Sequence, residues 1–506
     1  MTAATTRTSS RPETTLGGLL SGIAVISVAE LAGRGITGIT CDSRKVVSGN
    51  LFFALPGSHD DGARHVEEAA CKGAVAVVCQ GEISSHGIPV IGVPSARAAM
   101  ASASAAYYGH PSRTLAVAGV TGTNGKSTTA WIIRHLCGTV GRPCGLIGTI
   151  RYELPGLSEP ASRTTPESVD LQRMIAAMRD GGFRAVSLEV SSHALVQERV
   201  RALEFDAAVF TNLTQDHLDY HGTMDDYFEA KARLFTGLPA QTAKKGKAVI
   251  NVDDRYGRRL LDRIPKSVPV VTFGQGSNSA FRASAVRFSP LGTTFQLDAK
   301  GRSYLVRTPL IGLFNVYNTL AALAAVSVMG IELRRAVAAA ATIPQVPGRL
   351  ERVPARRNFQ AFVDYAHTPD ALENVLRSLR QIAPSRIITV FGCGGNRDRS
   401  KRPMMASVAE RLSDKVIVTS DNPRDEEPMA ILREVEKGFR GTSHEVYVDR
   451  ESAIRRAVEL AGPEDLILVA GKGHEDYQEI NGERHPFDDV KVTVRAMASR
   501  EIREDR

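Results

Sequence analysis

The chain has 506 residues, of which 43% are hydrophobic and 23% are charged. This composition is typical of globular proteins and excludes wholesale disorder and fibrous architectures, and the length predicts roughly two to four domains. No run of about 18 apolar residues occurs, which excludes a membrane-spanning helix. The 63 basic and 55 acidic residues give a net charge of +8, a mild excess that suits anionic small molecules as well as nucleic acid.

Cysteine usage and the first residues of the chain bear on its location. None of the six cysteines forms a CxxC pair, so neither a zinc ribbon nor a thioredoxin-type site is expected, and six are too few for a disulfide framework. Residues 1–15 are rich in Thr and Ser and lack an apolar segment, which predicts a disordered leader and no secretory signal. We therefore expect a cytoplasmic protein.

The first segment, residues 16–111, alternates short apolar runs with turn residues. Strands are predicted over 50–55, 74–79 and 90–93, and an Ala-rich helix over 95–108 closes the segment. This pattern indicates a small α/β domain.

The second segment, residues 112–345, predicts a mostly parallel sheet with helices on both faces. An apolar strand over 114–120 breaks into a Gly-rich loop, and a helical pattern follows over 127–137. Further apolar strands are predicted over 185–190, 207–213, 248–252 and 268–273. Residues 281–306 alternate without a helical period, which predicts an antiparallel patch, and an Ala-rich helix is predicted over 317–329.

The third segment, residues 346–506, again alternates strands and helices, which predicts a second doubly wound domain. Its strands are predicted over 361–365, 387–391, 415–419 and 465–470, and its helices over 369–379, 403–412 and 429–439. The predicted fold class is therefore α/β in three domains. These are a small N-terminal α/β domain, a central parallel-sheet domain like that of P-loop ATPases, and a C-terminal Rossmann-like doubly wound domain.

Residues 119–128 form a Gly-rich stretch between the predicted strand and helix of the second segment. Such a turn lets backbone N–H groups cradle phosphate, while Lys126 places a charge near the β/γ oxygens and Ser127 offers a hydroxyl to Mg²⁺. The strict GxxxxGK[ST] spacing would need Gly at position 120, where the chain has Val, so this is a variant phosphate loop. The alternative is a Gly-rich turn that binds nothing.

Two further stretches could hold a metal ion beside bound phosphates. Glu189 ends a predicted strand, where a Walker-B carboxylate would stand, although a strand-end Glu can also face solvent. Residues 212–222 crowd two aspartates with His217 and His221 into one loop. The spacing of the histidines could suit zinc, but no third strong ligand is near, so we favour Mg²⁺ over zinc and over a solvated polar loop.

Together these stretches resemble the Mur ligase family, the ATP-dependent amide ligases that build the stem peptide of peptidoglycan. The resemblance covers nearly the whole chain after the leader and rests on several motifs in the same order. The motifs are residues 121–127, 188–193, 212–222, 230–235, 312–318, 347–349 and 364–369.

Three more motifs resemble those of the family members that add the third residue of the stem peptide. Cys41-Asp42-Ser43-Arg44 resembles their UDP-binding motif, and Arg163-Thr164-Thr165-Pro166 resembles their muramoyl-dipeptide loop. Asp421-Asn422-Pro423-Arg424 is the motif that in this family marks meso-diaminopimelate, in place of L-lysine, as the added amino acid.

The chemistry of this choice can be argued from the residues. Diaminopimelate carries a carboxylate and an ammonium on its far centre, whereas lysine carries only the ammonium there. The Arg424 guanidinium can bind the carboxylate bidentately, Arg397 follows another strand and can aim at the same place, and Glu475 can take the ammonium. The alternative for each residue is a charge on a surface loop.

The resemblance implies a reaction and a task for each domain. The three domains would bind the UDP-sugar, ATP and the amino acid, in chain order. ATP would phosphorylate the D-Glu γ-carboxylate of UDP-MurNAc-L-Ala-D-Glu, and the amine of meso-diaminopimelate would attack the acyl phosphate. Two Mg²⁺ ions, N-carbamylation of Lys231 and domain closure around ATP are also implied. We expect a monomer that binds no nucleic acid.

The resemblance also implies roles for individual residues. Catalysis is assigned to Lys126, Glu189, His217 and Lys231, and metal binding to Ser127, Glu189, His217 and Lys231. ATP binding is assigned to Gly122, Thr123, Asn124, Gly125, Lys126, Ser127, Thr128, Asn315, Arg349 and His367. Binding of UDP-MurNAc-dipeptide is assigned to Cys41, Ser43, Thr164, Thr165, Ser191, Gln197 and Arg199. Binding of diaminopimelate is assigned to Arg397, Asp421, Asn422, Pro423, Arg424, Gly471 and Glu475.

Three other functions stay open. Arg424 argues against another ligase of the superfamily, such as the fourth-residue Mur ligase or a folylpolyglutamate synthase. A kinase-type phosphotransferase could use the same phosphate loop, but it would release ADP without phosphate and would need no third substrate. The combination of the four residues assigned to catalysis disfavours a regulatory module that only binds nucleotide.

Overall fold

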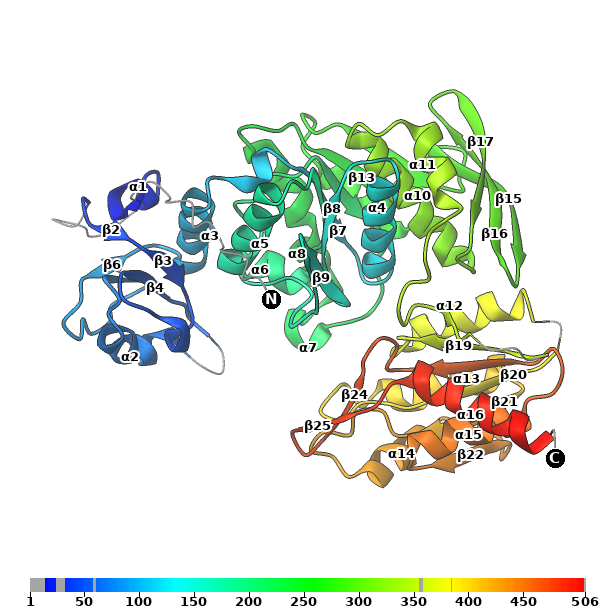
Figure 1. Ribbon diagram of the computed structural model, residues 1–506. Coiled ribbons are helices and arrows are strands. Elements are labelled where there is room, and N and C mark those ends of the chain that lie inside the picture. Colours follow the sequence, from blue (N-terminus) through cyan, green and yellow to red (C-terminus); the bar gives the residue numbers. More distant parts are fainter. Residues whose placement is uncertain (1–13, 24–31, 58–60, 355–357, 384, 505–506) are drawn as a thin grey trace, which may run out of the picture.

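The computed structural model describes residues 14–23, 32–57, 61–354, 358–383 and 385–504. The chain forms three α/β domains, each built on its own sheet, which confirms the predicted fold class. Figure 1 shows the N-terminal domain in blue at one side of the central domain, and the C-terminal domain in yellow to red below the central domain. None of the helices in these ranges combines the length and apolarity needed to cross a membrane.

A four-stranded parallel sheet forms the core of the N-terminal domain. Its strands, in spatial order, are β3 (Gly38–Thr40), β4 (Asn50–Ala54), β5 (Ala76–Cys79) and β6 (Val90–Gly92). The predicted Ala-rich helix is α3 (Ala96–Tyr107), which packs with α1 (Leu16–Leu20) on one face of the sheet, while α2 (Val66–Cys71) covers the other face. Because the strands are buried on both faces, they are continuously apolar.

The predicted leader is described only at its end. β1 (Thr14–Thr15) pairs with β2 (Gly35–Ile36), so the last two residues assigned to the leader form a short strand. Residues 1–13 lie outside the described part of the chain. Three short 3₁₀ turns follow in this part of the chain, η1 (Ser43–Lys45), η2 (Gly62–His65) and η3 (Pro111–Arg113).

The central domain is built on an eleven-stranded sheet in the order β10-β9-β8-β11-β7-β12-β13-β14-β15-β16-β17. The parallel strands are β7 (Ala116–Thr121), β8 (Cys144–Ile147), β11 (Ala185–Glu189), β12 (Ala207–Phe210), β13 (Lys247–Asn251) and β14 (Val270–Gly274). Antiparallel additions at the edges are β9 (Arg151–Leu154) with β10 (Leu157–Pro160), and β15 (Phe281–Ser289), β16 (Gly292–Ala299) and β17 (Arg302–Thr308). The antiparallel patch predicted over 281–306 is confirmed, and it continues the parallel sheet through β14.

Helices cover both faces of the central sheet (Figure 1). One face packs against α4 (Lys126–Thr139), α10 (Leu313–Val328) and α11 (Leu333–Ala340). The other face packs against α5 (Ser168–Asp180), α8 (Met224–Thr236) and α9 (Arg255–Arg263). The short elements α6 (Ser192–Val196), α7 (Leu218–His221) and η4 (Leu238–Ala240) stand in the connections.

The C-terminal domain has a six-stranded sheet in the order β18-β19-β23-β20-β21-β22. Its strands are β18 (Glu351–Arg352), β19 (Gln360–Asp364), β20 (Ile387–Phe391), β21 (Lys415–Thr419), β22 (His444–Tyr447) and β23 (Leu466–Ala470). Its helices are α12 (Pro369–Arg380), α13 (Lys401–Leu412), α14 (Pro428–Glu436), α15 (Arg450–Leu460) and α16 (Asp489–Glu504), and β24 (Tyr477–Ile480) pairs with β25 (Glu483–Pro486) in a hairpin. Two apolar cores, one on each face, hold the helices against the sheet.

Both large sheets gather loops at the carboxyl ends of adjacent parallel strands. In the central sheet β8, β11, β7 and β12 are neighbours, and in the C-terminal sheet β19, β23, β20 and β21 are neighbours. Open α/β sheets bind ligands at this edge. The two rows of loops are therefore where a site is expected, and the predicted functional motifs lie on them.

Candidate active site

The predicted phosphate loop connects β7 to α4, and two glycines set its shape. Gly122 and Gly125 have φ angles of +148° and +85°, which side chains with a Cβ rarely adopt. A Cβ at Gly122 would lie 1.9 Å from Thr211 Oγ1, and one at Gly125 would lie 2.3 Å from Asn318 Oδ1. Both positions therefore require glycine, because the neighbouring elements press directly on the loop.

Lys126 places its ammonium inside the curve of this loop. Its Nζ donates hydrogen bonds to the carbonyl oxygens of Gly122 (3.0 Å) and Thr123 (2.8 Å). Burial lowers the pKa of this ammonium, and the carboxylates of Glu189 and Asp216 partly oppose the shift. A positive charge enclosed by a Gly-rich loop at a helix N-terminus is suited to phosphate.

A cavity of about 210 Å³ opens beside the loop and gathers residues that the sequence assigned to different ligands. Its walls include Thr123 to Thr128 of the loop, together with Thr164, Ser191, His217, Lys231, Arg349 and His367. The cavity thus brings residues predicted to bind ATP, metal and muramoyl-dipeptide to one place. Thr149 also lines it, and no feature of the sequence had singled out this residue.

Glu189 is the buried carboxylate next to this cavity, with only 2% of its surface exposed. Its Oε2 accepts from Ser127 Oγ (2.9 Å) and from Thr149 Oγ1 (3.0 Å), and its Oε1 accepts from the Thr149 N–H (2.7 Å). A carboxylate beside a Ser hydroxyl supplies the hard oxygen ligands that Mg²⁺ prefers. In the described ranges no group of three His, Cys, Asp or Glu side chains could hold a metal.

Lys231 of α8 and His217, which directly precedes α7, line the same cavity. Lys231 is buried, donates to the Gly122 carbonyl (2.9 Å) and lies 4.5 Å from the Tyr227 ring centroid. Burial, with the nearby Lys126 charge, lowers its pKa well below the usual value. Burial also lowers the pKa of His217 to about 4, so this imidazole is neutral at pH 7.

The residues assigned to the muramoyl-dipeptide form one hydrogen-bonded group next to Glu189. Thr165 Oγ1 donates to the Glu189 carbonyl (2.8 Å) and to Ser191 Oγ (3.3 Å). Arg199 donates to the Thr165 carbonyl (2.8 Å) and to Gln197 Oε1 (2.6 Å). Thr164 joins this group through a 3.0 Å hydrogen bond between its Oγ1 and that of Thr149.

The two residues assigned to the UDP part lie apart from this group, in the N-terminal domain. Cys41 lines a second cavity of about 430 Å³ between that domain and α5. Ser43 is buried and donates to Glu68 Oε2 at 2.5 Å. Glu167 connects the domains, because its carboxylate lies 2.9 Å from the Arg199 guanidinium and 3.6 Å from that of Arg97 on α3.

The C-terminal domain closes the 210 Å³ cavity from the other side. Arg349 donates to Ser127 Oγ (3.2 Å) and stacks 4.5 Å above the Tyr365 ring, and His367 Nδ1 lies 2.8 Å from the Tyr365 carbonyl. Asn315, which was also assigned to ATP, does not line the cavity. It is 1% exposed and donates to the Ile311 carbonyl (2.8 Å) at the start of α10.

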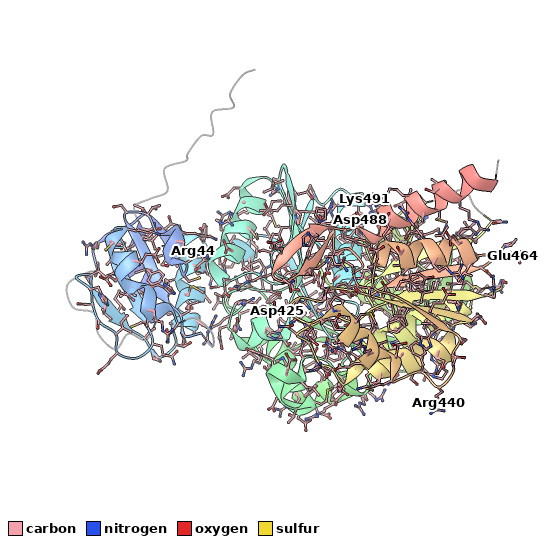
Figure 2. The ribbon with its side chains drawn as sticks, turned by 90° about the horizontal axis from the view of Figure 1, so that it is seen from below. Arg44, Asp425, Arg440, Glu464, Asp488 and Lys491 are labelled. Carbon is pink, nitrogen blue, oxygen red and sulfur yellow. The ribbon has the colours of Figure 1, made fainter. Side chains whose placement is uncertain are left out.

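The residues assigned to diaminopimelate lie on the loops after β20, β21 and β23. Asn422 Nδ2 donates to Glu475 Oε2 (2.8 Å), and a Cβ at Gly471 (φ +119°) would lie 2.4 Å from Asp421 Oδ2. The three loops therefore meet, and the two loops that follow β21 and β23 are joined by side-chain hydrogen bonds. Figure 2 shows that Asp425, in the loop after β21, and Glu464, which precedes β23, lie at opposite ends of the C-terminal domain.

The two arginines of this group both approach Gly394. Arg424 donates to the Gly395 carbonyl (2.7 Å), and its Nε lies 3.4 Å from Glu479 Oε2. A Cβ at Gly394 would lie 3.0 Å from Arg424 Nη1 and 3.8 Å from Arg397 Cγ, so this glycine separates the two side chains. The Arg424 guanidinium beside this glycine can bind a carboxylate bidentately.

A contact between domains joins the amino-acid loops to the cavity beside Glu189. The His474 ring, in the loop after β23, lies close to the backbone of Thr149 after β8. Burial lowers the pKa of His474 to about 3, so the ring is neutral. Thr149 therefore touches Glu189, the dipeptide group and the amino-acid loop.

Comparisons with known proteins cover all three domains. The profile "Mur ligase family, catalytic domain" matches residues 35–108, "Mur ligase middle domain" matches residues 120–326, and "Mur ligase, glutamate ligase domain" matches residues 348–473. A folylpolyglutamate synthase of Mycobacterium tuberculosis, solved with ADP and AMPPCP, shares the fold at 20% identity and a TM-score of 0.61, over 79% of this chain and 94% of its own.

Two relatives that match over most of their length share one name. The chain is 46% identical over 472 residues to the UDP-N-acetylmuramoyl-L-alanyl-D-glutamate–2,6-diaminopimelate ligase of Geobacillus kaustophilus, covering 92% of this chain and 95% of the relative. It is 43% identical to the ligase of that name from Pseudomonas aeruginosa, with the same coverage. A solved structure of a ligase of that name has a TM-score of 0.71 at 33% identity and covers 97% of this chain and 100% of its own. The chain belongs to the Mur ligase family.

Proposed function

We propose that the chain is an ATP-dependent amide ligase that joins meso-diaminopimelate to the D-Glu γ-carboxylate of UDP-MurNAc-L-Ala-D-Glu. The observation that carries the proposal is the contact between the two candidate sites. The loop that bears Glu475 reaches Thr149 through His474, and Thr149 bonds to Glu189 beside the phosphate loop. An acyl phosphate formed at the cavity would lie next to the incoming amine. The names of the two relatives that match over most of their length support the same substrates.

The first step is phosphoryl transfer from ATP to the γ-carboxylate, which gives ADP and an acyl phosphate. Two anions must approach each other, so the site has to offset their charge. Lys126, enclosed by the phosphate loop, and Arg349, bonded to Ser127, bring positive charge to the cavity from two domains. Fixed charges in a site that excludes water stabilise the transition state more than they would in bulk solvent.

Mg²⁺ would supply further positive charge when bound, and we propose two sites for it. Ser127 and Glu189 would hold one ion, and His217 and Lys231 the other. An ammonium cannot bind a cation, so Lys231 would act as an N-carbamate, formed when its neutral amine adds to CO₂ and loses a proton. The burial that lowers the pKa of this amine favours the neutral form that the addition needs.

The second step forms the amide bond. The neutral amine of diaminopimelate attacks the acyl carbon, the amine loses a proton, and the bond to the phosphate oxygen breaks. We assign Arg199 and Thr165 to holding the dipeptide, Arg424 and Arg397 to the distant carboxylate of the amino acid, and Glu475 to its distant ammonium. Holding both reactants in place removes most of the entropic barrier to such a step.

Phosphate release tests the proposal directly. The protein is given ATP, Mg²⁺ and UDP-MurNAc-L-Ala-D-Glu, with either meso-diaminopimelate or L-lysine. We expect release with the first amino acid and little with the second. Equal rates would contradict the assigned specificity, and no release with either would contradict the ligase function. Arg424→Ala should weaken use of the amino acid by about 2–5 kcal/mol and leave ATP binding unchanged.

The organisation of the molecule is proposed on the same basis. We place the domain bounds at residues 16–111, 112–345 and 346–506. We propose that the protein works as a monomer in the cytoplasm, where ATP and UDP-linked precursors are available. Sedimentation of the purified protein with and without ATP checks the oligomeric state.

A further inference from the structure

Arg450 stands at the start of α15 in the C-terminal domain, and its side chain is completely buried. Its guanidinium makes a bidentate pair with Asp489 at the start of α16, with Nε to Oδ1 and Nη2 to Oδ2 distances of 2.8 Å each. The Asp489 side chain is also completely buried. Neither residue lines a described cavity or was singled out by the sequence.

The other donors of this guanidinium reach two backbone carbonyls. Nη1 donates to the Ser420 carbonyl (3.2 Å), and Nη2 donates to the Ala470 carbonyl (3.0 Å). Ser420 directly precedes Asp421, and Ala470 directly precedes Gly471. One side chain is therefore bonded to the first peptide groups of both loops that carry Arg424 and Glu475.

The sheet itself does not join these two loops. β20 lies between β21 and β23, so no ladder of backbone hydrogen bonds connects the strands from which the loops leave. The Arg450 side chain connects the ends of these two strands through its bonds to the Ser420 and Ala470 carbonyls. A second connection lies within the loops themselves. The Asn422 amide bonds to Glu475, and the buried Lys472 bonds to both of these side chains.

We propose that Arg450, held by Asp489, is a positioning residue that sets the separation of the two loops and thereby the fit of the amino acid. The inference rests on the proposed function, because it needs those loops to bind diaminopimelate. A planar guanidinium can serve one carboxylate and two separate carbonyls at once, whereas a lysine ammonium is a single point charge with three donors. A buried ion pair by itself is weak evidence that two residues stabilise a fold. We therefore infer a positional role for Arg450 and Asp489.

The test compares Arg450→Lys with a matched control, Arg386→Lys. Arg386 forms a 2.7 Å pair with Asp465, and these residues precede β20 and β23 at the opposite edge of the same sheet. We expect Arg450→Lys to raise the KM for meso-diaminopimelate about tenfold or more while the KM for ATP and for the UDP-substrate change less than about twofold. Arg386→Lys should leave all three KM values unchanged.

Several outcomes would overturn the inference. One is an unchanged KM for the amino acid in a folded Arg450→Lys protein, and another is an equal rise for all three substrates. If Arg450→Lys does not fold, Asp489→Asn is tested in its place. This near-isosteric change weakens the bonds of Arg450 to residue 489 and leaves its bonds to the two backbone carbonyls. A rise in the amino-acid KM alone is again expected, and failure of both proteins to fold would assign the pair to folding and reject the inference. If the unmodified protein does not use meso-diaminopimelate, the proposed function fails instead.

Discussion

Thr149 shows how one small side chain can serve three parts of a site. Its N–H and hydroxyl both bond to the Glu189 carboxylate, its Oγ1 lies 3.0 Å from that of Thr164, and its backbone meets His474. Hydrogen bonds to a carboxylate fix its direction. A metal ligand held in this way needs little rearrangement when the cation arrives.

We therefore expect Thr149→Val to lower kcat for phosphate release, while Thr149→Ser remains close to the unmodified protein. Valine has nearly the shape of threonine, so the change removes one hydrogen bond to a charged group. Such a bond is worth about 1.5–3 kcal/mol, which corresponds to a rate loss of about tenfold or more. Steady-state phosphate release at saturating Mg²⁺ measures it. Equal activity of the two variants would show that the hydroxyl does not matter.

Asp364 gives a prediction for stability against pH. Burial raises the pKa of its carboxyl from 3.8 to about 6, although Arg349 and two backbone N–H donors, from Leu350 and Ala366, oppose the shift. Between about pH 4 and 6 the folded state binds the proton more tightly than the unfolded state does. The free energy of unfolding of the C-terminal domain should then fall as pH rises through this window, by up to about 3 kcal/mol, and level off above it.

Asp364→Asn should remove this pH dependence, because an amide does not titrate there. The variant also keeps at most one of the two hydrogen bonds, since an amide oxygen can accept from one of the two N–H groups but its NH₂ faces the other. Urea unfolding at several pH values between 4 and 7 measures the pH dependence. A slope that persists in the variant would assign the pH dependence to another group.

At the scale of elements, short apolar runs in the sequence were the features that predicted the buried strands. The bounds predicted for β20 and β21, 387–391 and 415–419, agree with the structure, because fully buried parallel strands are short unbroken apolar runs. The hairpin of β9 and β10 was missed. Its second strand is exposed throughout and ends at Pro160, so it carries no apolar alternation to detect.

The motif loops could be predicted because their chemistry is local in sequence, as in Gly125-Lys126-Ser127. Thr149 and Arg450 could not be predicted, because their partners are 40 and 39 residues away in the chain and only the fold brings them together. The sequence also cannot tell whether a polar residue lines a cavity. Asn315, which the resemblance assigns to ATP, bonds through its side chain to the Ile311 carbonyl just before α10.

The first turn of α12 makes a contact that can be tested at this scale. Asn124 of the phosphate loop donates to Asp370 Oδ2 (3.0 Å), which ties the N-terminus of this helix to the central domain. Asp370→Ala should raise the KM for ATP about fivefold, the value of a hydrogen bond of about 1 kcal/mol. Glu373→Ala is the control, because Glu373 bonds only to Arg377 and Arg411 in the described structure. Equal KM values for both variants would exclude a role for the contact in ATP binding.

At the scale of the whole molecule, charge is concentrated in a few places between domains. The net charge of +8 says little about the ligands, since many surface arginines in the described ranges pair with nearby carboxylates. The cationic side chains that we assign to anionic substrates come from two domains. Lys126 lies in the central domain, and Arg349 and Arg424 lie in the C-terminal domain. Such a site is complete only when the domains are together.

The size of the 210 Å³ cavity leads to a prediction about domain motion. Its volume of about 210 Å³ is below the roughly 300–1,000 Å³ typical of ligand sites, and its walls come from both the central and the C-terminal domains. We therefore expect these domains to separate when ATP enters, and the bound molecule then favours their closure. We expect the radius of gyration in solution to fall when a non-hydrolysable ATP analogue and UDP-MurNAc-L-Ala-D-Glu are added.

Small-angle X-ray scattering with and without these ligands measures the change. Asp370→Ala supplies an internal comparison, because it removes one interdomain hydrogen bond without touching the loops after β21 and β23. This variant should need a higher concentration of the ATP analogue to reach the same compact state. An unchanged radius of gyration in the unmodified protein at saturating ligand would mean that ATP enters by local movement of loops, and the two domains would then act as one rigid body.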